Sequence, residues 1–197
     1  MLRDYTALTQ KGLAAAVGYA QPPANAPERV TLADPAIRVM TDFRAVTAVV
    51  ILPGDAVDEA HHRMIQRGVR SLLVVNQDRD VVGLITATDI LGEKPMQVIS
   101  QRGIRRGELL VRDVMTPHDR LEALDLADVR TAKVGHIVTT LRKAGRQHTL
   151  VVEQDAHAAQ SVRGLFSATQ IARQLGVAIP TTEVAHTFAE IESQLAR

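Results

Sequence analysis

The chain contains no cysteine and no tryptophan, and only 3% of its 197 residues are aromatic. The lack of cysteine excludes disulfide bonds and thiolate metal sites. Since 46% of the residues are hydrophobic, a core can still form, built from Val, Leu, Ile and Ala. The net charge of +1 provides no overall field that would attract nucleic acid or an acidic membrane. No apolar run reaches the length of a transmembrane helix and no secretory signal stands out, so we expect a cytoplasmic protein.

One stretch of sequence occurs twice. Residues 83–90 read GLITATDI, and residues 164–171 read GLFSATQI. Each copy follows an apolar, β-branched run and precedes a helical pattern, which places a hydroxyl residue at a helix start. The unpaired N–H groups and the dipole of a helix favour anions at such a position. The two copies differ at their seventh residue, which is Asp89 in the first and Gln170 in the second.

Around the first copy the pattern predicts the order β-α-β-β-α. A continuous apolar run at 46–52 indicates a buried strand, and Asp55 is a suitable N-cap for the helix that follows. The helix carries an apolar stripe and ends at Gly68. The stripe consists of Val57, Ala60, Met64 and Ile65. The remaining predicted elements are strands at 71–75 and 81–86 and a short helix from Ala87.

The same order follows a second time. A connector at 92–107 has a helical middle at 96–101 and a basic end, and Val114-Met115-Thr116 then repeats Val39-Met40-Thr41. Strands are predicted at 121–126, 149–153 and 162–166, and a helix with the stripe Val134, Ile137, Val138 and Leu141 ends at Gly145. One unit of this size buries too little core to be stable alone, so we expect the two units to cover each other as one pseudo-symmetric domain.

These patterns divide the chain into four segments. We predict an N-terminal helix and Pro-rich arm at 1–33, the two units at 34–103 and 108–176, and an amphipathic C-terminal helix at 177–197. The apolar stripe of the last helix includes Phe188 and Leu195 and has to pack on the body or on a second subunit; we favour the second subunit.

The paired β-α-β-β-α units, the Val-Met-Thr lead-in and the Gly-h-h-[Ser/Thr]-x-x-[Asp/Asn] exit resemble tandem CBS domains, the Bateman module. The resemblance covers roughly residues 34–176. It implies an α/β (α+β) fold and a regulatory role without catalysis. Such modules bind adenosine ligands such as AMP, ADP, ATP or S-adenosylmethionine, often dimerise, and control a partner protein. This chain resembles a stand-alone pair that acts in trans, as a homodimer, on a partner whose identity the sequence does not reveal.

The resemblance also assigns residues. Thr86 would bind ligand phosphate and Asp89 would accept hydrogen bonds from both ribose hydroxyls. The remaining contacts would be Arg70 and His148 to phosphate, and Val49 and Val50 to adenine. In the second copy the uncharged Gln170 cannot hold a diol symmetrically, so a site at Ser167 and Gln170 should be weak or empty. We therefore predict one good site, which requires no cofactor and accepts its nucleotide with or without Mg²⁺.

Two alternative interpretations remain. Thr86 with Asp89, and Ser167 with Gln170, also fit helix capping boxes, which would make the protein a ligand-free dimeric scaffold. A basic loop at 102–106 could touch nucleic acid, although it has no interleaved aromatics and we do not expect this. His61 and His62 point about 100° apart on a helix and do not suggest a metal site, and no catalytic constellation is present.

Overall fold

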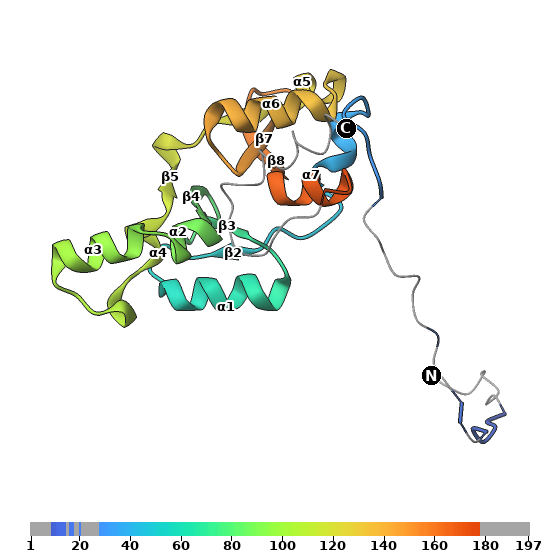
Figure 1. Cartoon of the computed structure of the whole chain (residues 1–197), viewed down its shortest axis with the longest axis horizontal. Coiled ribbons are helices and arrows are strands. Elements are labelled where there is room, and N and C mark those ends of the chain that lie inside the picture. The colour runs from blue at the N-terminus through green and yellow to red at the C-terminus, as the bar shows by residue number, and fades with distance from the viewer. Residues whose placement is uncertain (1–8, 15, 18–19, 21–27, 178–197) are drawn as a thin grey trace.

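The computed structural model describes residues 9–14, 16–17, 20 and 28–177. Its elements alternate along the chain as two similar series (Figure 1). The first series is η1 (Ala36–Val39), β1 (Thr41–Asp42), β2 (Val50–Ile51), α1 (Val57–Arg67), β3 (Ser71–Val75), β4 (Val81–Thr86), α2 (Ala87–Leu91) and α3 (Lys94–Arg102). The second is η2 (Arg106–Glu108), α4 (Val111–Val114), β5 (Thr116–Pro117), η3 (His118–Arg120), β6 (Ala123–Asp125), α5 (Leu126–Thr131), α6 (Val134–Ala144), β7 (His148–Gln154), β8 (Gln160–Ser167) and α7 (Ala168–Gln174).

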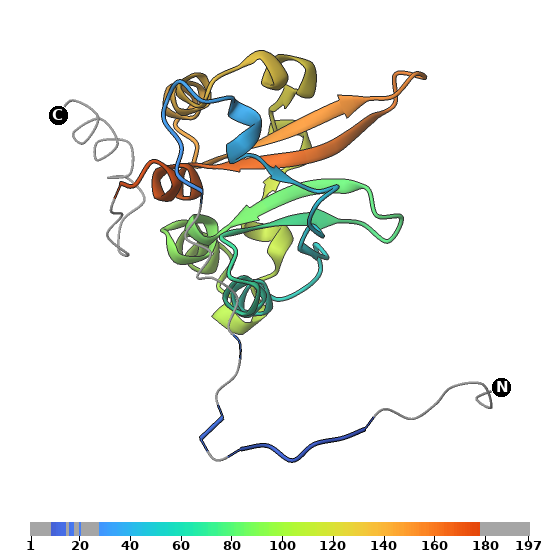
Figure 2. The ribbon, with the colours of Figure 1, turned by 90° about the vertical axis from the view of Figure 1, so that its right-hand side faces the viewer.

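The strands form two four-stranded sheets, in the orders β2-β3-β4-β5 and β1-β8-β7-β6. We call the first sheet with its helices unit 1 and the second unit 2. In each sheet a parallel pair is followed by an antiparallel hairpin, and the hairpins share a register irregularity at equivalent positions, Val74/Val75 and Val151/Val152. The β3–β4 and β7–β8 hairpins lie one above the other in Figure 2, with the helices outside them. The predicted pair of pseudo-symmetric α/β units is confirmed.

In each sheet, one edge strand comes from the chain segment that leads into the other unit. β1 precedes unit 1 in the chain but pairs with β8, and β5 precedes the rest of unit 2 but pairs with β4. The repeated glycines make these crossings possible. A Cβ on Gly164 would lie 2.6 Å from the carbonyl oxygen of Thr41, and one on Gly83 would lie 2.8 Å from that of Thr116. The glycine of the repeated motif is therefore required for close approach of the exchanged strand.

The hydrophobic core has three parts. Unit 1 is filled by residues of α1, β3 and β4 together with Leu109, Val111 and Val114, and unit 2 by residues of α6, β7 and β8 together with Val30, Ala36 and Val39. Each lead-in therefore completes the core of the opposite unit. A third cluster, centred on Leu73, Val75, Leu84 and Leu150, joins the two sheets. Burial of this cluster fixes the sheets against each other.

Several sequence predictions were wrong in detail. The strand predicted at 46–52 is reduced to β2, because the chain before it runs past the junction of the sheets and leaves Val46 and Leu52 exposed. In the same way, β6 ends at Asp125, which instead caps α5. Asp55 does not cap α1: the helix starts after Ala56, and the Asp55 carboxylate accepts the Leu52 N–H.

Other predictions concern the first helix and the two ends of the chain. Ile65 is 65% exposed and lies outside the buried stripe of α1. Residues 9–14 are not helical, and the rest of the predicted N-terminal helix and the C-terminal helix beyond Val177 lie outside the described residues. Among the described residues, no helix has the length and apolar character needed to cross a membrane.

Candidate functional site

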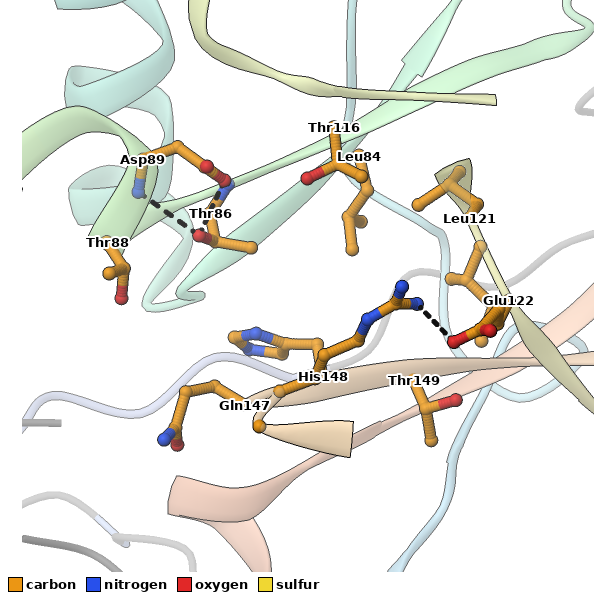
Figure 3. A pocket seen from close by; sticks show the side chains of 13 residues that line it. Leu84, Thr86, Thr88, Asp89, Thr116, Leu121, Glu122, Gln147, His148 and Thr149 are labelled. Carbon is orange, nitrogen blue, oxygen red and sulfur yellow. Dashed lines mark hydrogen bonds and ion pairs between the residues drawn. The ribbon is translucent and has the colours of Figure 1, made fainter. Parts of the chain in front are cut away.

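The first of two clefts lies between the end of β4 and the start of β7, and we call it the Asp89 cleft. Its volume is about 220 Å³, and its walls include Thr86 and Asp89 from unit 1 and Leu121, Glu122 and His148 from unit 2. Thr86 and Asp89 face His148 across the cavity (Figure 3). Because both units line the cleft, its shape depends on how they are placed relative to each other.

The Thr86 and Asp89 side chains form the predicted capping box. Oδ2 of Asp89 accepts the Thr86 N–H at 2.9 Å and the Thr86 hydroxyl at 2.7 Å, and the Asp89 N–H donates to Thr86 Oγ1 at 3.3 Å. A hydroxyl has a single proton, which Thr86 donates here to Asp89. The predicted contact of Thr86 with phosphate therefore requires the hydroxyl to rotate away from the carboxylate. α2, with five residues, is also too short for a substantial helix dipole.

Lys94 forms an ion pair with the other oxygen of the Asp89 carboxylate. Its Nζ donates to Asp89 Oδ1 at 2.9 Å and to the carbonyl oxygen of Val114 at 2.6 Å. The Asp89 side chain is only 15% exposed and the Lys94 side chain 43%, so the ion pair is shielded from solvent mainly on the carboxylate side. A carboxylate offers about four acceptor positions, and Thr86 and Lys94 use three of them. Asp89 thus keeps one acceptor position for a ligand hydroxyl while Lys94 stays in place.

The second cleft, which we call the Gln170 cleft, is related to the first by the pseudo-symmetry. Its volume is about 420 Å³, and its walls include Val49 and Arg70 from unit 1 and Ser167 and Gln170 from unit 2. Ser167 makes no side-chain cap of α7, and Gln170 Oε1 instead accepts the hydroxyl of Thr41 at 3.1 Å. The capping box expected for the second copy was wrong, because β1 from the other unit supplies a better-placed partner.

The charges of the two clefts differ. The Gln170 cleft is lined by Arg67, Arg70 and Arg173 and by no acidic residue. In the part of the chain that the structure describes, none of these arginines forms an ion pair. The Asp89 cleft contains two carboxylates, those of Asp89 and Glu122, and its Arg146 is paired with Glu122 at 3.1 Å. The Gln170 cleft is thus cationic, whereas both carboxylates of the Asp89 cleft are paired with a cation, Asp89 with Lys94 and Glu122 with Arg146.

His148 lines both clefts and separates them. It is 9% exposed, and its Nδ1 has no hydrogen-bond partner within the described structure. Its pKa is lowered to about 4, mainly by burial and also by the positive charge of Arg70, while the charge of Asp89 acts in the opposite direction. The imidazole is therefore neutral at physiological pH, and a polar atom of a ligand in either cleft can satisfy it.

Comparison with known protein families identifies the repeated unit. The model of the CBS domain matches residues 36–95, which run from η1 to the start of α3 and contain most of unit 1. Residues 36–95 thus belong to the CBS domain family. Unit 2 has the same strand order and register as this CBS domain, so the two units together form a CBS pair. A search of curated proteins found no match.

Solved structures with a fold similar to that of this chain include an uncharacterized conserved protein from Pyrococcus horikoshii. Its sequence identity is 20%, over 78% of this chain and 100% of that one, and the TM-score is 0.54. A putative signal-transduction protein with CBS domains from Burkholderia ambifaria MC40-6 has 19% sequence identity. The match covers 70% of this chain and 89% of that one, with a TM-score of 0.50. CBSX2 in complex with AMP has 19% sequence identity over 71% of this chain and 94% of that one, with a TM-score of 0.49.

The CBS pair divides the predicted site residues between its two clefts. Thr86, Asp89 and His148 line the Asp89 cleft, whereas Val49, Arg70, Ser167 and Gln170 line the Gln170 cleft. Val50 lines neither and faces a separate hollow between the hairpins. The sequence interpretation grouped Val49, Val50 and Arg70 with Asp89. In the structure they line other cavities than Asp89 does, because the segment before β2 lies beside the end of β8.

Sequence reasoning missed several lining residues. It paired Arg70 with His148, but the strand registers align His148 with Ser71 and Arg70 with Gln147. Equivalent residues of the two units are separated by the same number of positions from the first helix to the following strand, and this constant offset could have revealed the alignment. Lys94 could not have been found in this way, because it reaches Asp89 from a different helix. Arg67, Arg173, Leu121 and Glu122 also escaped notice.

The basic loop is largely neutralised. Arg102 pairs with Asp113 at 2.6 Å, Arg105 with Glu108 at 3.6 Å and Arg106 with Asp58 at 3.2 Å. This arrangement leaves little free charge for a nucleic acid backbone. Among the described residues, no group of three or more His, Asp or Glu side chains is placed to hold a metal ion.

Proposed function

We propose that this CBS pair is a regulatory module that binds an adenosine nucleotide, such as AMP, ADP or ATP, in the Asp89 cleft and acts in trans on a partner protein. The observation that carries the proposal is the Asp89 carboxylate, which is held in place by Thr86 and Lys94 and retains an acceptor position facing a cavity. A ribose hydroxyl is a suitable donor for that position.

The walls of the cleft suit the rest of a nucleoside. Leu84, Leu121 and Leu150 supply apolar surface for a base, and the unpartnered Nδ1 of His148 offers a polar contact. The cavity of about 220 Å³ is small for a whole nucleotide. Binding therefore requires the two units to separate slightly, and a ligand that favours this wider arrangement would shift the population seen by a partner.

The test uses the ribose 2′-hydroxyl as a probe. AMP and 2′-deoxy-AMP are titrated calorimetrically into the wild-type protein, Asp89→Asn and Gln170→Ala, the last of which changes the equivalent position of the other cleft. A hydrogen bond to a charged group contributes about 1.5–3 kcal/mol. We therefore expect AMP to bind roughly tenfold or more tightly than 2′-deoxy-AMP. Asp89→Asn should remove this preference and Gln170→Ala should keep it. Equal affinity for both ligands in the wild type would refute the role of Asp89.

A dimeric scaffold is the second candidate, and the exposed apolar side chains of unit 1 favour it. Ile65, Leu91 and Met96 are each more than 60% exposed on α1, α2 and α3. In unit 2 the position equivalent to Leu91 is Ala172, which is covered by Leu175 and Val177. Sedimentation of the wild type and of Leu91→Glu checks this candidate: a wild-type dimer that the substitution dissociates supports it, and a wild-type monomer excludes it.

A further inference from the structure

The three arginines of the Gln170 cleft have no basic counterparts in the Asp89 cleft. The αL residues Gly68 and Gly145 end equivalent helices, so Arg67 corresponds to Ala144. Arg70 corresponds to Gln147, since their carbonyl oxygens accept equivalent bonds from Ala87 and Ala168. The β4 and β8 registers place Arg173 at the position of Gly92. The pseudo-symmetric fold therefore does not itself require a cation at any of these positions.

The arginines approach the cavity from two sides. Arg67 and Arg70 flank the turn between α1 and β3 in unit 1, whereas Arg173 lies on α7 in unit 2. Arg70 is close enough to His148 for its charge to act on the buried ring. Since no carboxylate lines this cleft and none of the three forms an ion pair in the described part of the chain, their charges remain uncompensated.

Uncharged polar groups line the rest of the Gln170 cleft. The Oε1 of Gln170 is engaged by Thr41, which leaves the amide N–H groups as donors. The hydroxyls of Ser167 and Thr169 also line the cavity, as does His148, whose Nδ1 is buried and has no partner among the described residues. The cleft thus offers several donors and three positive charges but no anionic acceptor for a ribose diol. Guanidinium groups suit phosphate oxygens in geometry and charge.

We propose that the Gln170 cleft is a polyphosphate site, which binds two or more linked phosphates through Arg67, Arg70 and Arg173 and does not require a nucleoside. The polyphosphate could be a free inorganic chain or the tail of a nucleotide. In either case the charge of the phosphates, and not a sugar hydroxyl, determines affinity. The proposal does not depend on nucleoside binding in the Asp89 cleft.

The probe is inorganic tripolyphosphate, titrated calorimetrically into the full chain, with ATP and adenosine as parallel ligands. The variants are Arg70→Gln, the triple variant Arg67→Gln/Arg70→Gln/Arg173→Gln, and Arg130→Gln as a matched control that removes an exposed arginine outside both clefts. All of these arginines are exposed, so the fold should be retained, which the melting temperature checks.

We expect saturable binding of tripolyphosphate that weakens by roughly threefold to tenfold in Arg70→Gln and disappears in the triple variant. Arg130→Gln and Asp89→Asn should bind it as the wild type does, and affinity should fall as salt is added. If the triple variant loses ATP binding as well as tripolyphosphate binding, the triphosphate tail of a nucleotide is a second source of the ligand. Absence of tripolyphosphate binding, or equal binding by the triple variant, would overturn the proposal, whatever Asp89→Asn does to AMP.

Discussion

Acidification should destabilise the protein through His148. Its pKa in the folded state is about 4, against 6.5 for the unperturbed group, mainly because burial disfavours the imidazolium. Between these values the unfolded chain binds a proton that the folded chain does not. The stability is therefore fully present above pH 6.5 and is lost as the pH falls toward 4. At about 1.4 kcal/mol for each pKa unit, the loss approaches about 3 kcal/mol.

Urea unfolding followed by circular dichroism at several values between pH 7.5 and 4.5 measures this loss. His148→Gln serves as the reference, because its side chain is polar but does not titrate. The difference in unfolding free energy between wild type and variant should decline across this range. The pKa values of Asp34 and Asp113 are lowered below 3.8, by hydrogen bonds from Thr31 in the first case and, against the cost of burial, from Leu110 and Arg102 in the second. Protonation of these two carboxylates therefore affects the unfolding free energy only at a lower pH than protonation of His148 does. A difference that stays constant, or an NMR titration of His148 near pH 6.5, would refute the reasoning.

Two further substitutions test other parts of the structure. Gly164→Ala places a Cβ against the Thr41 carbonyl, so we expect thermal denaturation to show a loss of about 1–3 kcal/mol. Gly107→Ala, where nothing lies within 4 Å, should leave the stability unchanged or slightly raised, and an equal loss in both would contradict the close-approach argument. Lys94→Met frees an acceptor position on Asp89 and should tighten AMP binding by about tenfold in calorimetry, whereas weaker binding would mean that Lys94 itself contacts the ligand.

The elements governed by local patterns were the ones that the sequence predicted well. The apolar β-branched run at Val81–Thr86 is bounded by a polar turn and a helix start, and it forms β4 over the same residues. Gly68 and Gly145 end α1 and α6 in the αL conformation, as their positions suggested. In these places local propensity and tertiary packing agree.

The division into two clefts depended on long-range pairing. Nothing in the sequence around Thr41 or Thr116 indicates that each pairs with the opposite unit, so the lining of the clefts could not be derived from order along the chain. Gln170 illustrates the result. Its residue type suggested a helix cap, but the partner that it finds, Thr41, lies 129 residues away in the sequence. The capping residues of the first copy, by contrast, are three residues apart and were predicted correctly.

The exchanged strands β1 and β5 limit how the two units can move. Neither unit can swing away as a rigid body without tearing an edge strand from the other, so a ligand can rotate or slide the sheets by only a small amount. The same crossings mean that a fragment cut between the units would have one newly unpaired sheet edge, at β4 or β8, and one exchanged strand without its partner. Two such fragments could close each other's edges and rebuild the pair from separate chains. The exchange thus makes the paired arrangement, and not the single unit, the smallest independently folding body.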